Sequence, residues 1–161
     1  MARYLVKETA VLFRVGVINT TTTTTFGNGT SIPLGPEIGG REFLLIAEAD
    51  FELVCRLALS PGDRQLQERY RTFAGEYREA AASDRGIVEA GTRICNTARV
   101  TDTYCGPDVL IDGAVLVHNS TLFGGPGEET VVSHGAIVHN SCLQWGCRAT
   151  SGAIVKDSLL T

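Results

Sequence analysis

The stretch Val117-His118-Asn119-Ser120-Thr121-Leu122 returns as Val138-His139-Asn140-Ser141-Cys142-Leu143 and, more loosely, as Val155-Lys156-Asp157-Ser158-Leu159-Leu160. A phrase that recurs after roughly twenty residues is typical of a solenoid, in which each repeat stacks on the one before it. We therefore expect His118 to lie directly beneath His139, with Lys156 next in the same column. A fainter copy is expected upstream, at Ile94-Cys95-Asn96-Thr97.

Aliphatic side chains recur at near-sixfold intervals around these phrases. The series is Val88, Ile94, Val100, Cys105, Ile111, Val117, Val132, Val138, Leu143, Ala149 and Val155. Smaller side chains often stand two places before them, at Thr92, Val109, Val115, Ala136, Cys147 and Ala153. This pattern predicts short strands joined by tight corners, with every inward position stacked on its equivalent in the next coil. The segment 123–129 breaks the period and is expected to loop out.

Three regions follow from the pattern along the chain. Residues 1–34 contain a β-branched run and the threonine run 20–25, which favour extended chain, so this region is expected to belong to the β-helix. The threonines are either a solvated strand face or an array facing ice or carbohydrate. Residues 35–86 are expected to form an inserted helical hairpin, preceded by a loop at 37–41. Residues 87–161 are expected to form the repeat region.

The helical region has a clear internal pattern. Residues 44–59 are expected to form one helix, and Ser60-Pro61-Gly62-Asp63 to end it and start another, with Ser60 as the cap. The second helix carries an apolar stripe, Leu66, Tyr70, Phe73, Tyr77 and Ala81. The stripe is expected either to pack on the first helix or the β-helix wall, or to bind a partner.

The composition excludes several classes of protein. A chain of 161 residues forms one domain or a little more, and a net charge of −4 without a basic stripe argues against nucleic acid as the main partner. The N-terminus lacks the order of a signal peptide, and no apolar run is long enough to cross a membrane. Five cysteines without a C-x-x-C spacing favour a reduced, cytoplasmic setting.

The hexad pattern resembles the hexapeptide-repeat superfamily, which includes acyltransferases and γ-class carbonic anhydrases. The resemblance implies a mainly β fold, a left-handed parallel β-helix with an inserted α-helical hairpin. The segments 26–30, 39–42 and 83–86 are also similar to a bacterial family of long hexapeptide-repeat proteins described as nucleotide-sugar transferases. That second resemblance implies sugar or nucleotide-sugar metabolism.

Ser133-His134-Gly135-Ala136-Ile137-Val138-His139 resembles the His-Gly-Ala-x-x-His segment of γ-carbonic anhydrases. The resemblance implies a homotrimer in which His118 and His139 bind zinc or another divalent metal together with His134 of a neighbouring chain, with Asn119 and Asn140 as polar neighbours. Such a metal lowers the pKa of its bound water to about 7. Arg99-Val100-Thr101-Asp102 replaces the family's Arg-Gly-Asp segment, and Asp112 replaces a glutamine, which puts carbon dioxide hydration in doubt.

An acyltransferase would use the same residues differently. His139 or His118 would act as general base on an acceptor hydroxyl or amine, and corner N–H groups would stabilise the oxyanion. The looped-out residues 124–127 either line the pocket or are a mere insertion, and Cys142 and Cys147 are either soft-metal ligands or apolar filler. No sugar-nucleotide binding motif and no coenzyme A site is visible in the sequence.

Three functions remain open at this point. They are a transferase-like protein of sugar or nucleotide-sugar metabolism, a trimeric γ-carbonic-anhydrase-like metal protein, and a β-helix scaffold without catalysis. Because the open end of a solenoid exposes backbone edges, we also expect either that the chain is a fragment of a longer protein or that a partner covers its end.

Overall fold

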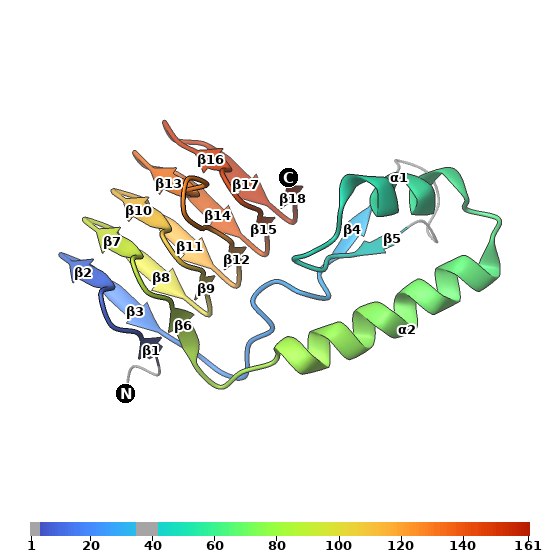
Figure 1. Cartoon of the computed structure of the whole chain (residues 1–161), viewed down its shortest axis with the longest axis horizontal. Helices are drawn as coiled ribbons and strands as arrows, with labels where there is room; N and C mark the ends of the chain where they lie inside the picture. The colour runs from blue at the N-terminus through green and yellow to red at the C-terminus, as the bar shows by residue number, and fades with distance from the viewer. Residues whose placement is uncertain (1–3, 35–41) are drawn as a thin grey trace.

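The computed structural model describes residues 4–34 and 42–161, so the expected loop at 37–41 lies outside the described residues. Three parallel sheets wind into a β-helix, and its coils stack from the N-terminal to the C-terminal end (Figure 1). The predicted mainly β fold, a β-helix with an inserted helical element, is confirmed. No described helix has the length and apolar character needed to span a bilayer.

Each sheet is built from short strands that lie far apart in the sequence. The first sheet contains β1 (Tyr4–Val6), β6 (Gly86–Val88), β9 (Tyr104–Cys105), β12 (Thr121–Leu122), β15 (Cys142–Leu143) and β18 (Leu159–Leu160). The second contains β2 (Val11–Phe13), β7 (Arg93–Cys95), β10 (Leu110–Asp112), β13 (Val131–Ser133) and β16 (Arg148–Ala149). The third contains β3 (Val17–Asn19), β8 (Arg99–Thr101), β11 (Leu116–His118), β14 (Ile137–His139) and β17 (Ile154–Lys156).

The core of the solenoid is the column of inward aliphatic side chains that the hexad pattern predicts. Nine of the predicted positions are 0% exposed: Val88, Ile94, Val100, Cys105, Ile111, Val117, Val132, Val138 and Leu143. Each is paired in register with its equivalent above or below, as Val117 is with both Val100 and Val138. Removal of these side chains from water is the main force that holds the coils together.

One predicted inward position is wrong. Val115 is 50% exposed, and its neighbour Ala114 is buried instead. The corner that contains Ala114 turns through a single left-handed residue, Gly113 at φ 67°, whereas the equivalent corner one coil later uses both His134 and Gly135. The two corners therefore present different residues to the core.

The repeated phrase is a corner motif between the third and first sheets. The asparagine of each copy adopts left-handed backbone geometry, with φ 44° at Asn119 and 49° at Asn140, which asparagine tolerates better than most residues. The amide of Asn119 donates to Asn140 Oδ1 at 2.9 Å, and that of Asn140 donates to Asp157 Oδ1 at 3.0 Å. The following serine donates to the backbone, as Ser120 Oγ does to His118 O at 2.7 Å. This amide ladder ties successive coils together.

The upstream copy of the phrase is not where the sequence predicted it. Ile94 lies on β7 in the second sheet, so Asn96 turns a different corner. The register places Val100-Thr101 of β8 beneath Val117-His118, and Asp102 then takes the left-handed corner position, at φ 54°. The true upstream copy is Val100-Thr101-Asp102-Thr103, which escaped detection because it lacks both the histidine and the asparagine.

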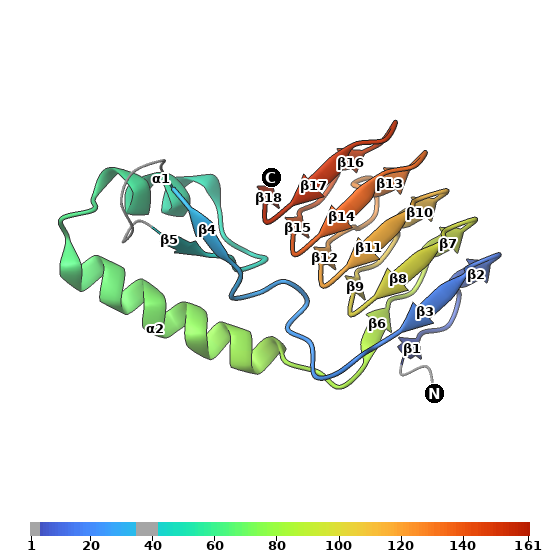
Figure 2. The same cartoon turned by 180° about the vertical axis from the view of Figure 1, so that it is seen from behind.

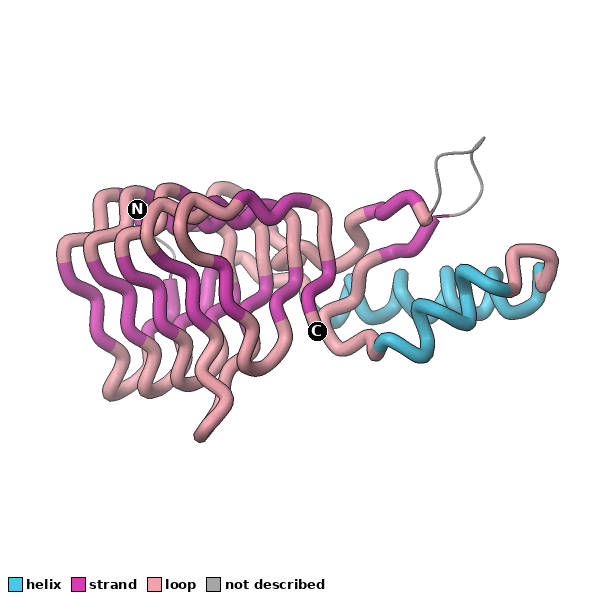
Figure 3. Tube along the Cα trace, turned by 90° about the horizontal axis from the view of Figure 1, so that it is seen from above, coloured by secondary structure: helices cyan, strands magenta, loops and turns pink. Residues whose placement is uncertain are grey.

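The insertion leaves the solenoid after β3 and returns at β6 (Figures 1 and 2). Its two ends are pinned together by paired backbone bonds between Thr24 and Ser83, at 2.8 and 2.9 Å. It contains an antiparallel hairpin of β4 (Ser31–Pro33) and β5 (Glu42–Leu44), followed by α1 (Phe51–Leu59) and α2 (Arg64–Ala81). Seen from above, it projects to one side of the coils (Figure 3).

Three predictions about the insertion need correction. The first helix begins at Phe51, because residues 42–44 pair as β5 and Asp50 caps the helix by accepting from Leu53 N at 2.6 Å. Asp63, not Ser60, caps the second helix. Phe73 of the predicted stripe is 50% exposed, and Ala74 takes its buried place. The buried face of α2 shares one apolar cluster with the hairpin, with α1 and with Cys142 of the solenoid, and within it Tyr70 stacks on Phe43 with centroids 5.5 Å apart.

Candidate functional site

The third sheet carries a column of polar side chains on its outer face, at the last position of each strand. The register from one end to the other is Asn19, Thr101, His118, His139 and Lys156. The predicted stacking of the two histidines, and of the lysine above them, is confirmed. Their ring centroids lie 5.0 Å apart at an interplanar angle of 43°.

A groove of about 410 Å³ runs along this column, and we call it the histidine groove. It is lined by Val17, Asn19, Thr21, Arg99, Thr101, Leu116, His118 and His139. Its volume falls within the roughly 300–1,000 Å³ of typical small-molecule sites. Arg99 is the one permanently charged side chain among these lining residues. The looped-out residues 124–127 are not among them, so they do not line this groove.

The surroundings of His118 determine which of its nitrogens faces the groove as an acceptor. Its Nδ1 lies 2.7 Å from Thr101 Oγ1 and 3.6 Å from Asp102 Oδ2. A carboxylate at that distance favours a proton on Nδ1, and the Nδ1–H then donates a hydrogen bond to the Thr101 hydroxyl oxygen. That tautomer leaves Nε2 with a free lone pair. Asp102 is held in place by Thr21, which donates to it from its backbone N at 2.8 Å and its Oγ1 at 2.9 Å.

Two buried polar atoms beside this arrangement have no hydrogen-bond partner among the described residues: Asn19 Oδ1 and His139 Nδ1. Burial of an unpaired polar atom costs about 1–3 kcal/mol, so each such atom in a folded protein needs an explanation, such as a bound water or ion or a role in catalysis. Asn19 lines the groove, but its Oδ1 is itself buried, so the groove presents other atoms of this side chain to a bound molecule.

The pKa of His118 is lowered, first by burial, next by the neighbouring His139 and Arg99, with Asp102 opposing the shift. A lowered pKa keeps the imidazole neutral at pH 7 and able to accept a proton.

We expect an NMR titration of the His118 ring to give a pKa below the ordinary value of about 6.5. Replacing His139 with Gln should raise that pKa, and replacing Asp102 with Asn should lower it further. Between the His118 pKa of the folded state and about 6.5, the unfolded chain binds more protons at this group than the folded chain does. The free energy of unfolding therefore rises with pH in that window and falls as the pH drops through it. A His118 pKa above 6.5 would contradict the geometry described here.

His134 lies elsewhere. It sits on the corner between β13 and β14, where its Nδ1 contacts Ser133 Oγ at 2.8 Å, and it lines a different hollow together with Asp112. Within residues 4–34 and 42–161, no three His, Cys, Asp or Glu side chains come together as a metal site. Any site that joins His134 to the stacked pair needs a second chain.

The other candidate residues have structural partners. Asn119 and Asn140 belong to the corner ladder rather than to the histidines: Asn119 Oδ1 accepts from Gly27 N at 3.0 Å and from Thr24 Oγ1 at 3.3 Å. Cys142 is 0% exposed on the first sheet, beneath the insertion, and burial raises the pKa of its thiol to about 12. A buried thiol of that kind is apolar filler, and Cys147 likewise packs against the solenoid core.

The residues that sequence reasoning missed are Asn19, Thr21, Thr101 and Asp102. Thr101 and Asp102 stood out only as departures from a family motif, Asn19 lay just before the threonine run, and Thr21 was one undifferentiated member of it. Thr21 and Asp102 are 81 positions apart, and only the coil register brings them together. An alignment of repeat phrases by corner type could have found Thr101, since it precedes the corner residue as His118 and His139 do.

Comparison with known proteins gives a family and little more. A family model described as "Domain of unknown function (DUF4954)" matches residues 1–161, the whole chain. The carboxylic acid reductase of Mycobacterium marinum is 34% identical over 87 residues, which make up 50% of this chain and 7% of that enzyme. The chain thus spans a small fraction of the length of that relative. The comparison with solved structures gave no match.

Proposed function

The chain belongs to the DUF4954 family, and from its site we propose that it is a hexapeptide-repeat transferase-like protein that moves an acyl or related group to a hydroxyl or amine. The β-helix fold is compatible with this function. The observation that carries the proposal is the orientation of His118, whose Nδ1 faces Thr101 and Asp102 while the ring lines the histidine groove.

The chemistry assigned to this groove is general-base catalysis. His118 Nε2 takes the proton of the acceptor O–H or N–H as that atom attacks the carbonyl carbon of an acyl thioester. The C–S bond breaks, and the thiol leaves with a proton returned from the imidazolium. A neutral base positioned in this way contributes about 10²–10⁴-fold to a rate. His139 is the alternative base, but it lacks an anchor for its Nδ1 among the described residues.

The substrate class follows from the rest of the groove. Asn19, Thr21 and Thr101 line the groove with polar side chains for a hydroxylated acceptor, which agrees with the sugar or nucleotide-sugar metabolism that the sequence resemblance implies. Arg99 supplies a positive charge for an anionic group on either substrate. A cytoplasmic setting is part of the same proposal.

The test is a transfer assay with purified protein. A panel of acyl-CoA thioesters is combined with amino sugars and nucleotide-sugars, and release of free thiol is followed together with mass spectrometry of the acceptor. We expect one acceptor to gain an acyl group. If the protein neither releases thiol nor binds any acyl-CoA of the panel, the transferase proposal is refuted and a scaffold role is left.

A trimeric γ-carbonic-anhydrase-like metal protein is the second candidate. It is favoured by the in-register stacking of His118 and His139 at 5.0 Å and by the outward position of His134 on its corner. Two imidazoles of one chain and one of another would hold zinc and leave an open coordination position, where the metal would activate a water molecule.

Metal analysis of the purified protein and its mass in solution test this second candidate. We expect one zinc per chain in a homotrimer, and loss of zinc after His134→Ala without dissociation of the trimer. A metal-free protein, or zinc retained by the His134→Ala variant, would refute it.

A further inference from the structure

A second hollow lies between the insertion and the first sheet, away from the histidine groove. It has a volume of about 250 Å³, and we call it the aromatic cleft, after its lining by Phe26, Glu48, Tyr77, Ile87, Tyr104 and Phe123. It exists because the insertion covers only part of the sheet. Along one outward column, Cys142 is 0% and Thr121 3% exposed, whereas Leu5 at the far end is 45% exposed. The cleft opens where this cover ends.

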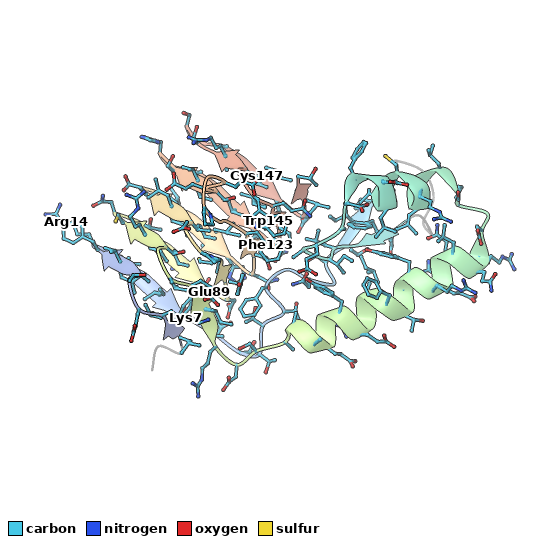
Figure 4. The ribbon with its side chains drawn as sticks, viewed as in Figure 1. Lys7, Arg14, Glu89, Phe123, Trp145 and Cys147 are labelled. Atoms are coloured by element: carbon cyan, nitrogen blue, oxygen red, sulfur yellow. The ribbon has the colours of Figure 1, made fainter. Side chains whose placement is uncertain are left out.

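Aromatic rings form a connected wall of the cleft. Phe26 and Tyr104 have centroids 6.1 Å apart, and Tyr104 meets Phe123 edge-on at 6.0 Å. Phe123 is stacked in turn on Trp145 at 4.7 Å, and Figure 4 shows the two side chains next to each other. Contacts of this kind fix ring positions, so the ring faces and edges are held in place before any ligand arrives.

The charge that lines the cleft is negative. Glu48 is the one charged side chain among the described lining residues, and no described cation forms an ion pair with it. Burial raises the pKa of the Tyr77 hydroxyl to about 12, and the negative charge of the nearby Glu48 carboxylate acts in the same direction. The Asn28 and Thr121 side chains of the cleft are already engaged: Asn28 Oδ1 accepts from Ala47 N at 2.8 Å, and Thr121 Oγ1 donates to Phe26 O at 2.8 Å.

We propose that the aromatic cleft binds a small organic cation, an ammonium group with apolar substituents. The faces of aromatic rings carry negative potential that attracts such a cation, and the Glu48 carboxylate supplies its counter-charge. An anionic ligand would meet that carboxylate without a compensating base. A neutral ligand would cover the rings but leave Glu48 without a counter-ion.

The structure supplies its own probe for this binding. Trp145 is the sole tryptophan of the chain, and it stacks on a ring that lines the cleft. Choline and its neutral isostere 3,3-dimethylbutan-1-ol are titrated against the purified full chain, and binding is followed by tryptophan fluorescence and by calorimetry. We expect choline to bind about tenfold or more tightly than the neutral isostere, as a cation–π contact plus a carboxylate implies.

Two variants decide where the cation binds. Glu48→Gln keeps the shape of the side chain and should weaken choline binding by about tenfold or more. Glu68→Gln, a matched change of an exposed carboxylate on α2 outside the cleft, should leave it unchanged, and circular dichroism confirms that both variants fold. Absence of choline binding, equal binding of the neutral isostere, or wild-type binding by Glu48→Gln would each overturn the proposal.

Discussion

Replacing His118 with Asn is expected to lower the rate of group transfer by about 10²–10⁴-fold, the contribution of a positioned general base. The reason is geometric: among the described residues, His118 is the histidine whose Nδ1 is fixed by Thr101 and Asp102, which leaves Nε2 to accept a proton in the groove. The measurement is kcat/KM for the acceptor identified by the transfer assay, with the free energy of unfolding measured beside it. His118 is half-buried on the outer face of a strand, so we expect folding to survive the change.

Three further variants separate the possible roles of the histidines. His134→Asn should keep the wild-type transfer rate, because His134 lies in a different hollow. His139→Asn should alter the pH dependence of the rate through its effect on the His118 pKa, and Asp102→Asn should shift that profile toward lower pH. Equal losses in all three histidine variants would instead point to a shared metal and against the general base.

Replacing Asn119 with Ala is expected to lower the free energy of unfolding by about 2–4 kcal/mol. Asn119 has left-handed backbone geometry, which disfavours alanine, and its side chain accepts from Gly27 N. The insertion lies directly against the corner at this point, since a β-carbon at Gly27 would lie 2.7 Å from Asn119 O. The contact is too close for another group to enter and accept the hydrogen bond of Gly27 N–H. Loss of the amide leaves a buried N–H without a partner. Urea unfolding measures the change.

Two controls divide this effect into its parts. Asn119→Gly keeps the backbone geometry and should lose only the side-chain bonds, so it should be milder than Asn119→Ala. Asn96→Ala places alanine in the same geometry at φ 49°, but there the lost side-chain bond to Asp112 is exposed. Its expected cost is about 1–2 kcal/mol. If Asn96→Ala is as destabilising as Asn119→Ala, the contact with the insertion contributes nothing.

The fold was predictable because the solenoid repeats the same local demand in every coil. Each coil needs an inward aliphatic residue at every sixth position, and many coils need an asparagine or aspartate at a left-handed corner. These residues therefore recur at regular spacing in the sequence. The insertion leaves no such trace. Residues 42–44 have the composition of a helix start, but they pair with β4, and tertiary pairing of this kind overrides local preference.

Only part of the site, the pair of stacked histidines, could be predicted from the sequence. His118 and His139 are visible because they repeat within the phrase, and their stacking follows from the repeat itself. Nothing in the sequence indicates that Asn19, Thr21 and Asp102 belong to the site, because their link to His118 exists only across coils. The aromatic cleft was equally hidden, since Phe26 and Tyr77 come from the insertion while Tyr104 and Phe123 come from the solenoid.

The repeated phrase and the sixfold pattern were enough to predict the β-helix, its inward column and the neighbouring imidazoles, because a repeat constrains every coil in the same way. The groups that complete the site could be recognised only in the folded molecule, since they meet through the lateral register of coils separated by a long insertion. That register places Thr101 beneath His118 and brings Asp102 to its Nδ1, while His134 turns a different corner. Hydrogen bonding across coils, and not proximity along the chain, turns a repeated histidine into a candidate base.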